Sequence, residues 1–288
     1  MAGLTRKPRS ARSTQRSEDF KAWTVGRKLD LSDLDPGAEP FSGSSHERDD
    51  ARLDELAIEV DRLQDLLYAN GSAGSPHKLL LVLQGMDTSG KDGTARAVFS
   101  RCSPLGVRVA AFKAPTEVER AHDVLWRVHA VVPRAGEIAV FNRSHYEDVL
   151  VPFVEGWIDA AERDRRLAHI NAFERLLTES GTRVLKCYLH ISKGEQKKRL
   201  QARLDDPAKR WKFQPGDLTA RAKWSRYRAA YETALAATST AHAPWLVIPA
   251  DSKTHRNLMI ATLVAQALRD MKLKAPEPDF DPAAITIT

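Results

Sequence analysis

The sequence is poor in cysteine and contains no long apolar run. Its 288 residues include two cysteines, Cys102 and Cys187, and neither lies in a CxxC pattern or a Cys/His cluster. A disulfide scaffold and a structural zinc site are therefore not expected. No apolar stretch approaches the roughly 20 residues that span a bilayer. The basic N-terminus lacks the apolar segment of a secretory signal. We expect a cytoplasmic protein without a membrane partner.

Positive charge is concentrated in two regions of the chain. Residues 1–28 carry eight Lys or Arg and two acids, and residues 193–231 carry twelve Lys or Arg and four acids. The whole chain has a net charge of +6, so the rest is acidic. This distribution indicates a polyanionic partner. For the first region the alternative is a solvated, disordered tail.

Alternating short apolar runs and helical patterns predict an α/β fold with a parallel sheet and helices on both faces. An amphipathic helix is expected over 47–70, closed by Gly71, and a capping box at Thr116 and Glu119 predicts a helix through Val131. We expect a flexible basic tail and extended arm (1–45), one main domain (46–275) with a helical lid at about 193–240, and a C-terminal tail (276–288). Strands are expected at 78–84, 107–112, 137–141, 183–191 and 244–250, and later helices at about 159–180 and 253–270.

The stretch GMDTSGK follows the first predicted strand and precedes a helix. It matches the first seven positions of the Walker A pattern, in which backbone N–H groups and a lysine bind phosphate. Lys91 is this lysine. The candidate phosphate-binding residues of the loop and the next helical turn are Gly85, Gly90, Lys91, Asp92, Gly93 and Thr94.

Two acids beside this loop, Asp87 and Asp92, depart from the nucleotide-hydrolysing pattern, which has Ser or Thr after the lysine. Carboxylates repel phosphate unless a cation lies between them, and Mg²⁺ bridges the two kinds of oxygen. Both acids are therefore candidate metal ligands. As alternatives, Asp87 stabilises the turn and Asp92 favours the first turn of a helix.

The third strand ends in Asn142 and Arg143, where ligands bind in open α/β sheets. Arg143 can neutralise a transferring phosphoryl group. Lys113 ends the second strand, and Arg127 is a further candidate phosphate ligand unless it forms a helix-surface ion pair with Asp123. His145 is more consistent with a structural histidine.

The stretches GMDTSGKDGT, FKAPT, FNRSHYEDVL and KGEQKKRLQARLDDPAKRWKFQPGDL together resemble family-2 polyphosphate kinases over about residues 20–270. The resemblance implies a P-loop kinase core with a helical lid, Mg²⁺ (or Mn²⁺ in its place) as cofactor, and a homo-oligomer, dimeric or tetrameric. It implies phosphoryl transfer from inorganic polyphosphate to nucleotides. FNRSHYEDVL is similar to the subgroup that phosphorylates both AMP and ADP, whereas the commonest pattern, FDRSWYNR, has Asp in place of Asn142.

The resemblance also implies roles for individual residues. Asp87, Lys91 and Arg143 would be catalytic, and Lys198, Arg199 and Arg203 belong to the lid motif. We expect Lys197, Lys198, Arg199 and Arg203 to form one basic helix face that grips polyphosphate.

Two other functions compete with this one. An ATP-dependent kinase of a small molecule would not need polyphosphate. A nucleic-acid-binding module would use the basic regions for charge and Trp211, Phe213, Trp224 and Tyr227 for stacking. We do not expect a nucleic-acid partner, because such binding needs no phosphate loop.

Overall fold

The computed structural model describes residues 19–43 and 45–287, and the tail predicted before residue 19 lies outside this part. Within the described residues, no helix has both the length and the apolar character needed to cross a membrane. The strands are β1 (Lys78–Gln84), β2 (Val107–Ala111), β3 (Ile138–Asn142), β4 (Thr182–His190) and β5 (Trp245–Pro249). The α-helices are α1 (His46–Ser72), α2 (Lys91–Phe99), α3 (Glu117–Arg120), α4 (Trp126–His129), α5 (Glu147–Glu155), α6 (Ala160–Glu179), α7 (Lys193–Asp205), α8 (Pro215–Ala222), α9 (Trp224–Thr238) and α10 (Lys253–Asp270).

The five strands form one parallel sheet in the order β2-β3-β1-β4-β5. Four of these strands, β1, β3, β4 and β5, are almost fully buried, as expected of strands covered on both faces, whereas the edge strand β2 has no fully buried residue. The register pairs Leu83 with Asn142, so β1 and β3 end side by side. The loops that follow these two strands therefore meet at one edge of the sheet, and the predicted α/β class is confirmed.

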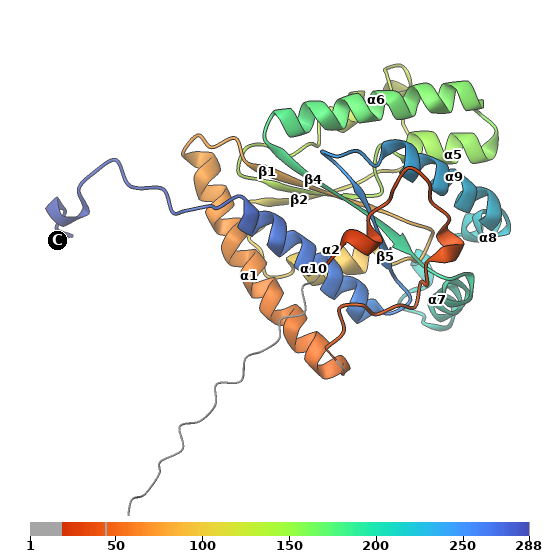
Figure 1. Cartoon of the computed structure of the whole chain (residues 1–288), viewed down its shortest axis with the longest axis horizontal. Helices are drawn as coiled ribbons and strands as arrows, with labels where there is room; N and C mark the ends of the chain where they lie inside the picture. Colours follow the sequence, from red (N-terminus) through yellow and green to blue (C-terminus); the bar gives the residue numbers. More distant parts are fainter. Residues whose placement is uncertain (1–18, 44, 288) are drawn as a thin grey trace, which may run out of the picture.

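Helices cover both faces of the sheet, as predicted. Figure 1 shows α1, α2 and α10 on one side of the strands and α5, α6 and α9 on the other. The prediction that Gly71 closes the first helix is wrong, because α1 continues to Ser72. Gly71 instead allows a close approach of two segments, since a Cβ on it would lie 2.5 Å from the Cα atom of Gly136.

The predicted helix from Thr116 through Val131 is also wrong. The capping box at Thr116 and Glu119 is present, but α3 ends after one turn at Arg120. The side chain of Asp123 then accepts a hydrogen bond from the backbone of Leu125 at 2.9 Å, and α4 begins separately. A side chain that bonds the backbone two residues later starts a turn and competes with a continuous helix.

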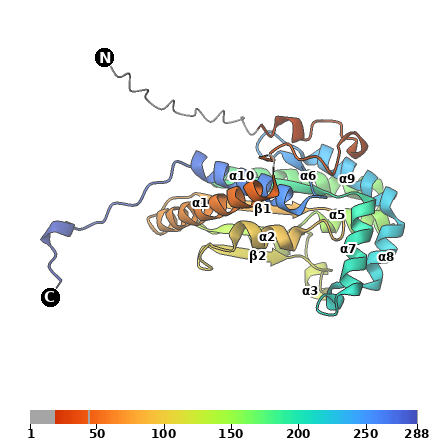
Figure 2. The same ribbon diagram turned by 90° about the horizontal axis from the view of Figure 1, so that it is seen from below.

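The predicted lid segment contains two parts with different packing. Figure 2 shows α7 and α8 together beyond one end of the sheet. By contrast, α9 buries Ala230, Tyr231 and Leu235 and packs with α5 and α6. Pro215 begins α8, and a break at Lys223 separates α8 from α9. Of these helices, α7 and α8 therefore lie beyond the carboxyl ends of the strands, whereas α9 packs mainly against other helices.

The predicted arm before α1 packs along β5, the strand at one side of the sheet. Thr24 forms an antiparallel bridge with Leu246 of β5, and the backbone N–H of Val25 donates to Trp245 at 2.9 Å. Leu31 is buried, and the N–H of Phe41 donates to His255 Nε2 at 3.0 Å. These contacts join the arm to β5 and α10.

Candidate active site

The loop between β1 and α2 has a backbone that needs glycine at two positions. Gly85 has a φ of 151° and Gly90 a φ of 105°. A Cβ on Gly85 would lie 2.7 Å from the carbonyl oxygen of Leu189, and one on Gly90 would lie 2.0 Å from Arg256 Nη1. Thr88, which is not glycine, also has a positive φ of 63°. The loop is therefore held in a strained shape by its surroundings.

Lys91 begins α2 and is 7% exposed. Its ammonium donates to the carbonyl oxygens of Gly85 and Met86 at 2.8 and 3.3 Å. Burial, and then the nearby Arg143, lower the pKa of Lys91 to about 8. A phosphate oxygen would be a stronger acceptor than these carbonyls because it is charged, so the ammonium can exchange loop carbonyls for phosphate.

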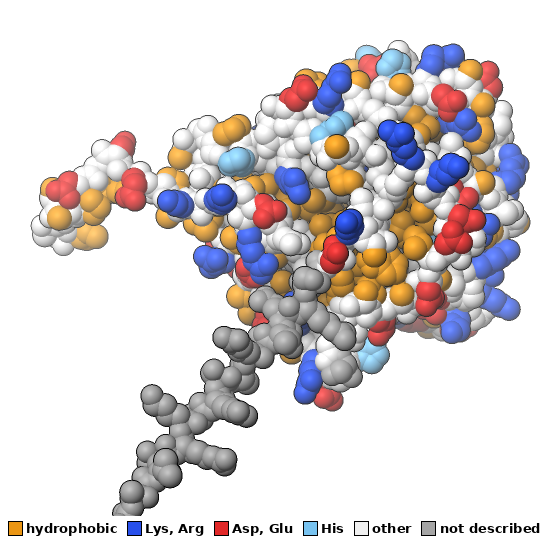
Figure 3. Space-filling model, viewed as in Figure 1, with side chains coloured by type: hydrophobic (Ala, Val, Ile, Leu, Met, Phe, Trp, Pro, Cys, Tyr) orange, Lys and Arg blue, Asp and Glu red, His pale blue; other side chains and the backbone are white. Residues whose placement is uncertain are grey.

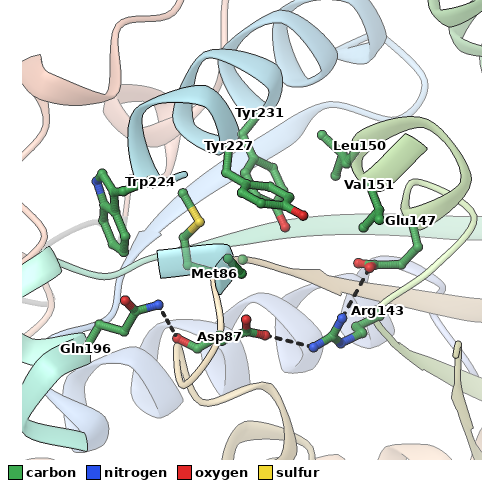
Figure 4. Close-up of a pocket in the computed structure, with 12 residues that line it drawn as sticks. Met86, Asp87, Arg143, Glu147, Leu150, Val151, Gln196, Trp224, Tyr227 and Tyr231 are labelled. Carbon is green, nitrogen blue, oxygen red and sulfur yellow. Dashed lines mark hydrogen bonds and ion pairs between the residues drawn. The ribbon is translucent and has the colours of Figure 1, made fainter. Parts of the chain in front are cut away.

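Asp87, Arg143 and Glu147 form a row at the ends of β1 and β3. Arg143 Nη2 lies 2.8 Å from Asp87 Oδ1, and Arg143 Nη1 lies 3.3 Å from Glu147 Oε2. Burial opposes the charge of Arg143, but Glu147 and Asp87 outweigh it and raise the pKa of the guanidinium. Figure 4 shows this row beside a cavity of about 60 Å³ that Trp224, Tyr227 and Tyr231 also line.

The turn after β3 is anchored from the interior. Arg143 has a φ of 62°, and its N–H donates to Leu83 at 3.1 Å. His145 is buried, and its Nε2 lies 3.3 Å from Glu174 Oε1, which supports the structural role expected for it. Glu174 also accepts from Tyr146 at 2.8 Å and from Lys186 at 2.6 Å. This buried network lies behind the turn that presents Arg143.

Asp92 and Asn142 interact directly. Asn142 Nδ2 donates to Asp92 Oδ1 at 2.5 Å. Asp92 also lies in the first turn of α2, where an acid is favoured in any case. One carboxylate oxygen of Asp92, a predicted metal ligand, thus accepts a hydrogen bond from the Asn142 amide. The nitrogen of that amide cannot bind a metal.

No group of three or more His, Cys, Asp or Glu side chains suited to a metal is present in residues 19–43 and 45–287. Mg²⁺, however, keeps several waters and often uses one or two carboxylates together with substrate phosphates. Asp87 and Asp92 line one pocket, and Asp217 of α8 lines it as well. These oxygen ligands fit a magnesium ion that a phosphate completes.

This phosphate pocket has a volume of about 590 Å³ and is strongly basic. It lies between the phosphate loop, the ends of β2 and β3, and the lid helices. Figure 3 shows Lys and Arg side chains along the edge of the molecule formed by α7 and α8. The basic residues of the pocket are Lys91, Lys113, Arg143, Arg199, Arg203, Lys209, Lys212 and Lys253, against the acids Asp87, Asp92 and Asp217.

The predicted basic face of α7 is not a single face. Arg199 and Arg203 line the phosphate pocket, whereas the Lys198 side chain is 81% exposed and lies outside its lining. Lys197 is exposed as well. Arg199 and Arg203 are four residues apart and share a side of the helix, which the two lysines do not. The prediction that all four basic residues lie on one helix face and bind polyphosphate is therefore wrong.

Two other predicted phosphate ligands have different partners. Arg127 forms a buried pair with Asp148, with Nη2 2.8 Å from Oδ2, so the alternative of a pair with Asp123 is wrong, although Arg127 does line a pocket beside the site. The Thr94 hydroxyl accepts from Arg256 Nε at 2.8 Å and lies 3.0 Å from Asn257 Oδ1. Thr94 is fully buried and does not reach the pocket, whereas Gly93 lines it.

Sequence reasoning missed Arg256, which is 2% exposed behind the phosphate loop. Burial, and then the neighbouring Arg199, lower the pKa of Arg256 to about 9. The available signal was an arginine in the first turns of α10, directly before a long apolar stretch. Such a residue is ordinarily assigned to the solvent-facing side of a helix.

A second pocket of about 620 Å³ adjoins the first. Phe112, Lys113 and Arg143 line both pockets. The second pocket has more apolar walls, which come from the segment after β2, from α5 and from the α5–α6 connection. Its apolar residues include Phe112, Pro115, Val151, Pro152, Trp157 and Ile158. The site therefore combines a basic pocket with a second pocket, whose apolar walls suit an aromatic ring and whose cations suit a negatively charged group.

The chain is similar to proteins of one family. The family model described as Polyphosphate kinase 2 matches residues 43–276. An AMP/ADP-polyphosphate phosphotransferase from Meiothermus ruber is 47% identical over 264 residues, covering 90% of this chain and 96% of the relative. An ADP-polyphosphate phosphotransferase from Rhodopseudomonas palustris is 38% identical, covering 88% and 90%. The crystal structure of polyphosphate kinase 2 from Arthrobacter aurescens matches with a TM-score of 0.89 and 47% identity, covering 92% of this chain and 93% of that one.

Proposed function

The chain belongs to the polyphosphate kinase 2 family, and on this basis we propose that it transfers the terminal phosphoryl group of inorganic polyphosphate to nucleoside mono- and diphosphates. One structural observation supports this proposal above the others. Two pockets of different character meet at Arg143 and Lys113. Two anionic substrates can therefore approach each other at a shared pair of cations.

We assign polyphosphate to the basic pocket and the nucleotide to the second pocket. The basic pocket contains the phosphate loop and the lid arginine Arg203, which suits a chain with about one negative charge per phosphate. The second pocket offers Trp157 and Phe112 as apolar surfaces for a base or ribose. Pockets of this kind commonly combine apolar walls with a few charged groups.

The proposed reaction is an in-line attack by a nucleotide phosphate oxygen on the terminal phosphorus of the chain. The bond to the next bridging oxygen breaks, and the shortened polyphosphate leaves as an anion. The attacking oxygen is ionised at neutral pH, so no strong general base is required. Lys91 and Arg143 would orient the transferred group and neutralise its charge, which is how most phosphoryl-transfer enzymes act.

Mg²⁺ is the proposed cofactor, with Mn²⁺ as a substitute, and Asp87 and Asp92 would hold it. When bound, the ion supplies charge neutralisation between the two polyanions. To hold it, Asp87 has to share its carboxylate with Arg143, and Asp92 has to give up or share its bond with Asn142.

We propose AMP and ADP as acceptors, because the Meiothermus ruber relative is named for both. Relatives named for ADP alone and for GDP also match, so guanine nucleotides belong in the same test. A homo-oligomer remains a prediction. The cytoplasm remains the proposed compartment, and both cysteines are free, as a reducing environment would keep them.

The deciding experiment measures nucleotide turnover with polyphosphate and Mg²⁺, offering AMP, ADP, GMP and GDP separately. We expect AMP to give ADP and then ATP. If AMP is inert while ADP reacts, the assignment of both acceptors fails. Turnover of ATP with a small-molecule acceptor and indifference to polyphosphate would instead identify the competing kinase function. Filter binding of single-stranded DNA, with and without polyphosphate competitor, tests the nucleic-acid alternative.

A further inference from the structure

Arg199 of the lid helix α7 uses every one of its donors on the protein itself. A guanidinium has five N–H groups. Nε donates to Glu195 at 2.9 Å, and Nη1 donates to the carbonyl oxygens of Thr88 and Ser89 at 3.0 and 3.3 Å. Nη2 donates to the carbonyl oxygens of residues 250 and 251, both at 2.8 Å. The residue that the family motif suggests for gripping polyphosphate has no donor left for it.

Arg256 of α10 reaches the same loop from another element. Its Nη1 donates to the carbonyl oxygen of Ser89 at 3.0 Å, and its Nε donates to Thr94 at 2.8 Å. Nη2 donates to Asn257 Oδ1 at 2.9 Å. The acceptors of this buried guanidinium are carbonyl, hydroxyl and amide oxygens, and none of them carries a negative charge.

Two cations thus converge on the outer side of one peptide unit. In a planar trans peptide the C=O and N–H groups point in opposite directions. When Arg199 and Arg256 hold the Ser89 carbonyl, they direct the N–H of Gly90 away from themselves. Gly90 lines the phosphate pocket, where backbone N–H groups bind phosphate. A separate bond from Arg199 Nη1 holds the carbonyl of Thr88, the strained residue of the loop.

We infer that Arg199 and Arg256 are positioning residues: they hold the carbonyl groups of Thr88 and Ser89 outward, so that the loop presents the N–H of Gly90 to polyphosphate. Neither residue contacts the substrate in this arrangement. Gln196 adds a third bond from α7 to the loop, with Nε2 donating to the Asp87 carbonyl at 3.1 Å. The inference rests on the proposed function in that polyphosphate is the loop's ligand.

The test uses Arg199→Gln and Arg256→Gln in the full chain, with Arg175→Gln on α6 as a matched control. Arg175 is exposed and lies 3.9 Å from Glu179, away from the site. Hydrogen exchange is followed in the peptide covering residues 85–91. Tripolyphosphate binding is measured by calorimetry across a salt series. Arg203→Gln serves as the reference for a residue that contacts the anion.

We expect exchange in residues 85–91 to accelerate about tenfold in both variants and tripolyphosphate to bind about tenfold more weakly, as the loss of one charge-assisted hydrogen bond would produce. The salt dependence of binding should stay as in the parent, because a contact that releases counterions is not removed. Arg203→Gln should reduce that dependence. Arg175→Gln should change neither quantity.

The inference is overturned if loop exchange is unchanged in the variants, or if Arg199→Gln reduces the salt dependence as Arg203→Gln does. Should the glutamine variants not fold, Arg199→Lys and Arg256→Lys keep the charge but lose the fork that reaches two oxygens. They should still accelerate loop exchange, and parent-like exchange in them contradicts the inference. Failure of the parent to turn over polyphosphate would refute the proposed function instead, and the exchange measurement is independent of turnover.

Discussion

Replacing Asn142 with Asp should convert its hydrogen bond with Asp92 into a repulsion between two carboxylates, which bound Mg²⁺ should relieve. The substitution removes the amide that donates to Asp92 and places two carboxylates side by side. Two charges about 4 Å apart repel by about 1 kcal/mol in water and about 4 kcal/mol at an effective dielectric constant of 20. Because Asp92 is exposed, the lower value applies. The lost hydrogen bond adds about 1 kcal/mol.

Without metal, Asn142→Asp should therefore lower the free energy of unfolding by about 2 kcal/mol, a fall in Tm of about 4–8 °C for a chain of this size. Mg²⁺ should restore stability, because it lies between carboxylates that would otherwise repel. Relief of the repulsion of about 1 kcal/mol corresponds to about fivefold tighter Mg²⁺ binding than in the parent. The assay is thermal unfolding in EDTA and across a Mg²⁺ series, without nucleotide or polyphosphate.

The matched control is the exchanged pair Asp92→Asn/Asn142→Asp, which keeps one carboxylate and one amide in contact. It should behave as the parent does in EDTA and in Mg²⁺. If Asn142→Asp and the parent gain equal stability from Mg²⁺ at every concentration, the metal does not bind between these positions. If the exchanged pair is as unstable in EDTA as the single variant, repulsion is not the cause.

Asp87→Asn should lower turnover by about 10²-fold or more, because one substitution removes both the proposed metal ligand and the partner of Arg143. EDTA should lower the turnover of the parent to the same extent, and full activity in EDTA would refute the metal's role. The pKa of Lys91 is about 8 in the folded protein, below its ordinary 10.5, so between pH 8 and 10.5 the unfolded chain binds a proton at Lys91 that the folded protein has lost. The free energy of unfolding of the parent, measured in urea, should therefore rise over this pH range relative to that of Lys91→Met. Parallel pH curves for the two proteins would contradict this pKa. Arg127→Met should lower the free energy of unfolding by about 3–5 kcal/mol, because Asp148 is left buried and unpaired. A variant whose KM for the nucleotide changes while its urea midpoint stays that of the parent would refute this structural role. Added salt should raise the KM of the parent for polyphosphate steeply, since exposed charges are screened over about 8 Å at physiological ionic strength. The rise should be smaller for Arg203→Ala. If KM depends on salt equally in both proteins, Arg203 is a solvated surface residue.

The sequence predicts the sheet and its functional edge well because these depend on local patterns. Short apolar runs define buried strands, and the residues after β1 and β3 meet wherever those strands are parallel neighbours. Asp87, Lys91 and Arg143 could be selected on this basis. Their proximity follows from the pairing of β1 with β3, which the alternation of strands and helices does not specify.

Pairings between distant segments could not be predicted in the same way. Arg127 had Asp123 as a local partner at helical spacing, but the structure places it on Asp148 instead. Arg199 was expected to face polyphosphate because its neighbours are basic, yet it bonds to loops that follow β1 and β5. A charged side chain does not reveal from its own position whether a carbonyl or a ligand satisfies it. For Arg199 that information comes from segments more than 50 residues away, and for Arg127 from a residue 21 positions away.

The charged groups of the site are satisfied by one another before any substrate arrives. Asp87 holds Arg143, Asp92 accepts from Asn142, and Lys91 donates to loop carbonyls. Polyphosphate, nucleotide and metal must therefore exchange these partners rather than fill empty positions. The exchange is favourable for Lys91 because a charged phosphate oxygen is a stronger acceptor than a carbonyl. For Asp87 it is favourable only when the metal and phosphate arrive together, since phosphate draws Arg143 away and leaves the carboxylate free for the cation. Binding of donor and metal should consequently be cooperative at this site.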